Sequence, residues 1–161
     1  MAAMKASARA PLDSVDAAVF SAALGDRRVA GGVPGELLVQ AEAQGAPANL
    51  GAMESEVRWR MRGLSFSTDH SFRRRSRVPA IVPPTLALPR PYRLISHSEW
   101  IGRDNPGGVF ILSRPGYNRD RSQALIYVLH ACQFCGSAVY LLLDRGPGGW
   151  AVSAEELVWE S

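Results

Sequence analysis

Lysine is almost absent from this 161-residue chain, because Lys5 is the only one and arginine carries nearly all of the positive charge. The 15 acidic residues nearly balance the 18 basic ones and leave a net charge of +3. A dedicated nucleic-acid-binding protein shows a broader basic surface than this balance predicts. We therefore expect no nucleic-acid partner.

Long hydrophobic runs are missing as well. A membrane-spanning helix needs roughly 18 or more consecutive apolar residues, and no run in the sequence approaches that length. A signal peptide keeps an uninterrupted apolar stretch, whereas Asp13, Asp16 and Ser21 interrupt the corresponding stretch here. We expect no membrane span and a cytoplasmic location for the chain as given, with export as the alternative if the true translation start lies upstream.

Familiar catalytic motifs are absent too. The sequence has no G-x-S-x-G, H-E-x-x-H, Walker loop or dinucleotide-binding glycine motif. Its three histidines are scattered, and Glu155 and Glu156 are a carboxylate pair only in sequence. Chemistry requires polar groups that converge on one place. We expect a non-enzymatic structural or binding domain without a cofactor, and the sequence leaves its partner open.

The composition of the chain and the pattern of its apolar residues predict one globular α+β domain. Apolar residues make up 47% of the chain and charged residues 20%, as in ordinary folded proteins. We expect a flexible N-terminus over residues 1–12 and a single domain over 13–161. Its helical half, residues 13–77, should hold two to three helices: one after Asp13 as N-cap, one over about 52–62, and one after Thr68. Residues 36–43 are a weak strand candidate.

Five prolines make residues 78–91 an extended connector, because proline fixes φ and removes a backbone donor. Beyond it, residues 92–161 predict an antiparallel β-meander of about five strands, since the breaks are too short for crossover helices. The expected strands are residues 92–96, 109–113, 123–131, 137–143 and 150–153, with a last piece at 157–161.

Both cysteines lie in the segment H-A-C-Q-F-C-G, residues 130–136, between two apolar runs. A redox pair needs a cysteine at a helix N-terminus, but Gly136 and a predicted strand follow. A structural zinc ion needs four ligands, and His130, Cys132 and Cys135 supply only three. A tight turn brings residues i and i+3 within about 7 Å, which is compatible with a disulfide. We favour a structural turn, and a thiol-dependent redox or zinc function through Cys132 and Cys135 is the alternative.

Two polar segments complete the candidates. Arg114, Tyr117, Asn118 and Asp120 lie in a loop between two predicted strands, and loops on rigid sheets often carry ligand sites. Asn and Asp also suit turn positions for purely structural reasons, so both interpretations stay open. The arginine-rich residues 73–77 are interpreted as the solvated end of a helix.

Several segments of the C-terminal half occur in the order S-R-P-G-Y-N-R-D (113–120), A-L-I-Y-V (124–128), Y-L-L-L (140–143), W-A-V (150–152) and W-E-S (159–161). As a set they resemble a family of uncharacterised bacterial domains that are often exported or lipid-anchored. The resemblance implies a bacterial origin and no particular activity. Members that lack the cysteine pair argue against a universal catalytic role for Cys132 and Cys135.

Overall fold

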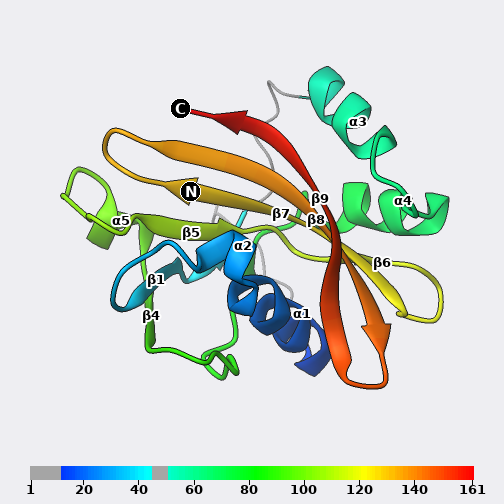
Figure 1. Ribbon diagram of the computed structural model, residues 1–161, viewed down its shortest axis with the longest axis horizontal. Coiled ribbons are helices and arrows are strands. Elements are labelled where there is room, and N and C mark those ends of the chain that lie inside the picture. The colour runs from blue at the N-terminus through cyan, green and yellow to red at the C-terminus, as the bar shows by residue number, and fades with distance from the viewer. Residues whose placement is uncertain (1–11, 45–50) are drawn as a thin grey trace, which may run out of the picture.

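The computed structural model describes residues 12–44 and 51–161, with the backbone alone in residues 51–54. It confirms the mixed α+β class and shows a seven-stranded, mostly antiparallel sheet (Figure 1). The described elements, in chain order, are α1 (Ser14–Gly25), α2 (Arg27–Ala30), β1 (Leu37–Gln40), β2 (Glu42–Ala43), α3 (Gly51–Trp59), α4 (Phe66–Arg75), β3 (Ala80–Ile81), β4 (Tyr92–Ile95), α5 (His97–Trp100), β5 (Val109–Leu112), β6 (Gly116–Tyr117), β7 (Gln123–Ala131), β8 (Gly136–Gly146) and β9 (Gly149–Glu160).

The sheet is larger than the predicted five-stranded meander. Its order is β4-β1-β5-β7-β8-β9, and β6 also pairs with β7. β1 comes from the N-terminal half and pairs in parallel with both β4 and β5. The chain between β4 and β5 therefore crosses over β1 and carries the short helix α5. The prediction of purely antiparallel pairing was wrong here, because residues 96–108 are long enough for a parallel crossover.

The described part of the chain contains five helices, where two to three were predicted. The first expected helix is confirmed as α1, and Asp13 and Asp16 form a reciprocal capping box at its start. The third begins earlier than predicted, because Ser65 rather than Thr68 is the N-cap of α4. The two short helices α2 and α5 were not predicted. None of the described helices is long and apolar enough to cross a membrane.

Helices cover both faces of the sheet, which explains why β7 and β8 are apolar on both sides. α1 and α2 lie on one face, and α3 and α4 lie on the other (Figure 1). Alternate residues of each strand serve the two cores: Ile126 and Leu141 belong to the α1 side, while Tyr127 and Tyr140 belong to the α4 side.

β9 is one long strand where the sequence predicted two pieces. Its pairing with β8 shifts register twice, between Ala138 and Val139 and between Leu142 and Leu143. A bulge inserts one residue and so changes which face the following side chains occupy. Accordingly, Trp150 and Val152 pack against the α1-side core, whereas Ala154 and Val158 pack against the α4-side core. The gap between the two predicted pieces coincides with the adjacent charged residues Glu155 and Glu156.

The proline-rich residues 78–91 include β3, which pairs with β2. Ala80, Val82 and Leu86 of this segment are buried in the α1-side core. The Tyr92 hydroxyl donates to the Pro84 carbonyl at 2.7 Å and accepts from the Leu86 amide at 2.8 Å. These bonds hold the segment against the edge of the domain.

Candidate functional site

The structure joins Cys132 and Cys135 in a disulfide at the tip of the β7–β8 hairpin, with Cα atoms 5.0 Å apart. The Cys132 amide donates to the Cys135 carbonyl at 3.1 Å. β8 begins at Gly136, so a strand follows the pair and not the helix whose N-terminus would lower a thiol pKa. Phe134, between the cysteines, is 92% exposed.

His130 makes two contacts, one through its Nε2 and one through its ring face. Its Nε2 donates to the Gly107 carbonyl at 2.7 Å, and its ring stacks on Phe110 with centroids 4.3 Å apart. Within residues 12–44 and 51–161, no group of three or more His, Cys, Asp or Glu side chains is placed to hold a metal ion. A zinc site with Cys132 and Cys135 would require the disulfide to be broken, because zinc binds thiolates.

The polar loop after β6 uses its side chains to close its own turn. Asn118 Oδ1 accepts from the amides of Ser122 and Gln123 at 3.0 and 2.9 Å. Asp120 Oδ1 accepts from the Ser122 hydroxyl at 2.7 Å and from its amide at 3.2 Å, and these bonds hold the pKa of Asp120 below its usual value. Asn118 and Asp120 therefore serve the turn.

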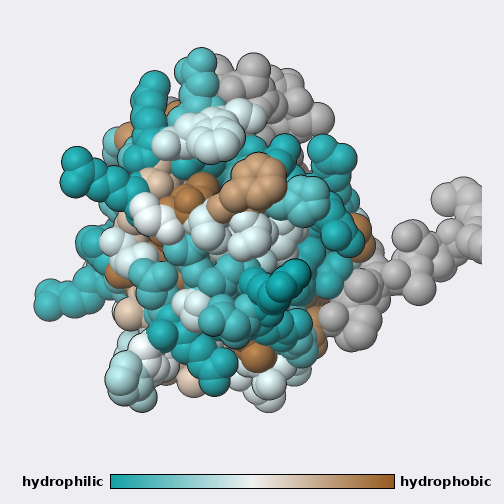
Figure 2. All heavy atoms as spheres, turned by 90° about the vertical axis from the view of Figure 1, so that its right-hand side faces the viewer, coloured by the Kyte–Doolittle hydropathy of each residue, from teal (hydrophilic) through white to brown (hydrophobic). Residues whose placement is uncertain are grey.

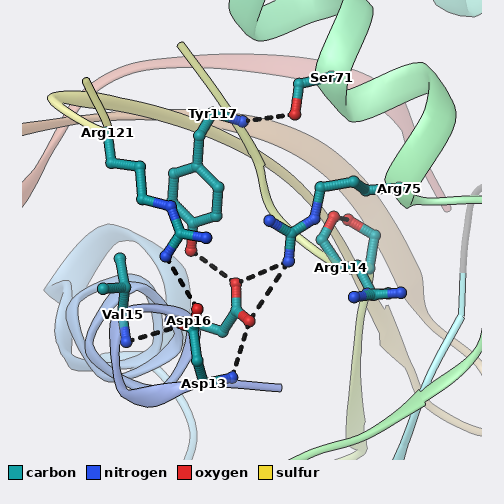
Figure 3. Close-up of polar contacts among 9 residues, drawn as sticks. Asp13, Val15, Asp16, Ser71, Arg75, Arg114, Tyr117 and Arg121 are labelled. Atoms are coloured by element: carbon teal, nitrogen blue, oxygen red, sulfur yellow. Dashed lines mark hydrogen bonds and ion pairs between the residues drawn. The ribbon is translucent and has the colours of Figure 1, made fainter. Parts of the chain in front are cut away.

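Tyr117, the last residue of β6 before this loop, points into a buried cluster centred on Asp16 (Figure 3). The Asp16 carboxylate accepts from the Tyr117 hydroxyl at 2.7 Å, from Arg75 at 3.2 and 3.3 Å, and from the Asp13 amide at 3.0 Å. Asp16 is only 1% exposed. One carboxylate thus ties α1, the end of α4 and β6 together.

Two arginines flank the Tyr117 ring, and the guanidinium carbons of Arg75 and Arg121 each lie 5.1 Å from its centroid (Figure 3). Burial, followed by the Asp16 carboxylate, raises the pKa of Tyr117 far above its usual value. The hydroxyl therefore remains a donor at any ordinary pH. Arg121 also pairs with Asp13 at 2.8 Å.

Arg114 lies beside this cluster. Its Nε is buried and has no hydrogen-bond partner among the described residues. Burial and the neighbouring Arg75 lower the pKa of Arg114. Of the four predicted loop residues, Tyr117 and Arg114 thus lie together at the Asp16 cluster. Asn118 and Asp120 lie apart from it and stabilise the turn.

A different surface, on α3 and α4, has the character of a binding site. Trp59, at the end of α3, is 75% exposed and Phe66, at the start of α4, is 71% exposed. They line a pocket of about 240 Å³ whose other apolar lining residues are Met61 and Leu64. Figure 2 views the molecule from the α4 side, where apolar atoms reach the surface among hydrophilic side chains.

The inner part of this pocket is held by a buried ion pair. Arg58 Nε donates to Asp69 Oδ1 at 2.6 Å, and Arg58 also donates to the Tyr140 hydroxyl at 3.1 Å. The Arg58 guanidinium lies 5.8 and 5.5 Å from the ring centroids of Phe72 and Tyr140. α3 is thereby locked to α4 and to β8.

A second pocket of about 340 Å³ adjoins the first and shares Phe66 with it. Its other lining residues come from successive turns of α4: Ser67, His70, Ser71, Arg74 and Arg75. Arg73 reaches Asp69, which lines the first pocket, at 3.2 Å. We call the residues that line the two pockets, together with Arg73, the basic aromatic face.

The charge of this region differs from that of the rest of the chain. Residues 58–77 contain seven arginines and one aspartate, a formal charge of +6, whereas the whole chain carries +3. The remainder of the chain is therefore net negative. From the sequence we identified only residues 73–77 as a cluster of positive charge and did not include Arg58, Arg60 and Arg62, which precede it.

Sequence reasoning also missed Trp59 and Phe66, although a signal existed for the first. In the helix predicted over about 52–62, Trp59 is two positions from both Val57 and Met61, so it falls on the side opposite these two apolar residues. An exposed tryptophan between Arg58 and Arg60 was therefore predictable. Phe66 carried no such signal, because its exposure depends on where α4 begins.

Comparisons of the chain with protein-family models, with curated proteins and with solved structures find no match.

Proposed function

We propose that this chain is a non-enzymatic binding domain that engages its partner through the basic aromatic face. The observation that carries the proposal is the exposure of Trp59 and Phe66 on either side of a pocket. Tryptophan, phenylalanine and arginine are enriched where proteins bind one another, and Trp and Arg supply much of the binding energy. All three residue types meet here.

These aromatic side chains are not needed by the core beneath them. That core receives Val57 from α3, Met61 from the connection that follows and Phe72 from α4, and all three are buried. Leaving two large rings in water forgoes roughly 1.5–3 kcal/mol of burial for each ring. A partner that covers them recovers this free energy.

The face is also held rigidly, which favours binding because less conformational freedom is lost. Gln123, at the start of β7, accepts from the Ser65 amide at 2.9 Å and from the Thr68 hydroxyl at 2.8 Å. Its Nε2 donates to the Gly63 carbonyl at 2.7 Å. One side chain thus fixes the connection between Trp59 and Phe66 to the sheet.

Site-specific photocrosslinking in the source cells tests this proposal. A benzophenone amino acid replaces Trp59 or, as the matched control, Phe134, which is still more exposed and lies on the distant hairpin tip. We expect a discrete adduct from position 59 that disappears when Arg73 and Arg74 are changed to glutamate, and none from position 134. Equal adducts from both positions, or no adduct from position 59, would overturn the proposal.

A second candidate function is thiol-dependent and acts through Cys132 and Cys135. The supporting observation is that the disulfide lies on an exposed tip, beside a pocket of about 270 Å³ lined by Cys132 and Trp100. One thiolate of a dithiol partner would attack one sulfur, which breaks the Cys132–Cys135 bond and forms a mixed disulfide. The partner's second thiol would then attack that mixed disulfide, which leaves both cysteines reduced and the partner oxidised to a disulfide. The variant Cys132→Ser/Cys135→Ser separates the candidates, since an unchanged cellular phenotype with intact folding excludes this one.

A further inference from the structure

We propose that the partner is an acidic protein segment that seats one apolar side chain between Trp59 and Phe66 and one carboxylate beside Ser71 and Arg74. The inference rests on the proposed function and specifies its partner. It follows from the order of the two pockets along the face and from the charge that surrounds them.

The first pocket fits a single apolar side chain. Its volume of about 240 Å³ lies below the 300–1,000 Å³ that is typical of pockets for cofactors and drug-sized ligands. Met61, Leu64 and the two exposed rings give it an apolar lining. Arg58 and Asp69 are already bonded to each other, so an aliphatic guest leaves neither of them unpaired.

The second pocket supplies donors for an anion on the far side of Phe66. Arg74 is exposed, and no other described residue forms an ion pair with its guanidinium. Ser71 Oγ accepts from the Tyr117 amide at 3.0 Å, which leaves its own hydrogen to donate. Arg75 is bound to Asp16 and adds positive charge nearby. A carboxylate is the protein group that matches these donors.

The surrounding charge favours a segment with several acidic residues. The exposed arginines of residues 58–77 are Arg60, Arg62, Arg73, Arg74 and Arg77. Among residues 55–77, the single exposed acidic side chain is Glu56. Opposite charges speed association and exclude partners of the wrong sign.

Two other anionic partners fit the geometry less well. Single-stranded nucleic acid stacks successive bases on exposed rings along a positively charged groove that follows its backbone, whereas Trp59 and Phe66 flank one small pocket with an apolar lining. An anionic membrane presents a continuous surface, which does not fill two separate pockets. Both are outcomes that the experiment can identify.

The test is fluorescence polarisation with a labelled short peptide of Asp and Glu residues around one central Leu. We expect it to bind the full chain in low salt and to weaken as salt increases. Trp59→Ala and Arg74→Glu should each weaken binding by about tenfold or more. The matched controls, Phe134→Ala and Arg145→Glu, alter exposed side chains outside the face and should change the affinity less than about twofold.

A double-mutant cycle locates the leucine. Replacing the peptide's Leu by Ser should weaken binding to the unchanged chain by about tenfold, and should have little further effect on Trp59→Ala. Additive losses would contradict the placement of that side chain in the first pocket.

The remaining outcomes separate the partner from the function. If oligouridylate or vesicles of phosphatidylglycerol bind and the peptide does not, with losses in Trp59→Ala, the face binds but the acidic segment is wrong. If none of the three probes binds and position 59 still gives its crosslinked adduct, the acidic segment is again wrong while the binding domain stands. If no probe binds and position 59 gives no crosslinked adduct, both the acidic segment and the binding domain are wrong.

Discussion

The variant Asp16→Ala tests how the buried cluster joins the helices to the sheet. The change removes a 1% exposed carboxylate that accepts hydrogen bonds from Tyr117, Arg75 and the Asp13 amide. Removing one partner of a buried charge pair costs about 3–5 kcal/mol. The Arg75 side chain is 23% exposed and water can partly solvate it, so the expected loss is about 3 kcal/mol.

Urea denaturation followed by circular dichroism measures this loss. With an m-value of about 2 kcal/mol/M, the unfolding midpoint should fall by roughly 1.5 M. Tyr117→Phe is the matched control: it removes one bond, keeps the ring between Arg75 and Arg121, and should cost about 1–2 kcal/mol.

The double variant makes the test sharper. Once Asp16 is alanine, the Tyr117 hydroxyl is buried without that acceptor, so adding Tyr117→Phe should be neutral or stabilising. A midpoint shift below about 0.5 M for Asp16→Ala, corresponding to about 1 kcal/mol, would refute the structural role of the cluster. Strict additivity of the two changes would also count against it.

Two further variants and one titration have defined expected results. Gly116→Ala should destabilise by about 1–3 kcal/mol in the same urea assay, because a Cβ at this position would overlap the α4 backbone, and unchanged stability would show that α4 packs elsewhere. Replacing Cys132 and Cys135 by serine should cost about 2 kcal/mol at most, since the closed loop is very short, and global unfolding would contradict the purely local role. The carboxylate of Asp120 accepts hydrogen bonds from Ser122, and these bonds lower its pKa in the folded protein below the usual 3.8. The ionised Asp120 therefore stabilises the fold fully above pH 3.8, and this contribution is lost as the pH falls through the lowered pKa of the folded state. An NMR titration of the Asp120 carboxyl should show this lowered pKa, and a pKa at or above 3.8 would contradict the bond.

The helices and strands that were predicted correctly are those determined by residues close to one another in the sequence. Asp13 caps α1 with its neighbour Asp16, and β7 spans the predicted residues 123–131. In both cases, signals a few residues apart determine the outcome. The α+β class follows from the same local patterns.

Features that depend on distant contacts were missed. The parallel pairing of β1 with β4 and β5 joins segments more than fifty residues apart and leaves no local signature. Likewise, the bond between Tyr117 and Asp16 spans 101 positions. Tyr117 therefore looked like a loop residue free to bind a ligand, although the fold uses it to hold α1.

The candidate binding surface was missed for a related reason. Trp59 and Phe66 belong to different helices, and only the turn held by Gln123 of β7 places them beside one pocket. The arginines of residues 58–77 were visible in the sequence, but their relation to exposed rings depends on where α3 ends and α4 begins.

The central claim is that the basic aromatic face is a binding surface, and one affinity comparison tests it most directly. The labelled acidic peptide is titrated against the full chain and against Trp59→Ala/Phe66→Ala, whose side chains are largely exposed and should leave the unfolding midpoint unchanged. The account predicts a loss of affinity of about a hundredfold. Equal affinities for the two proteins would contradict it.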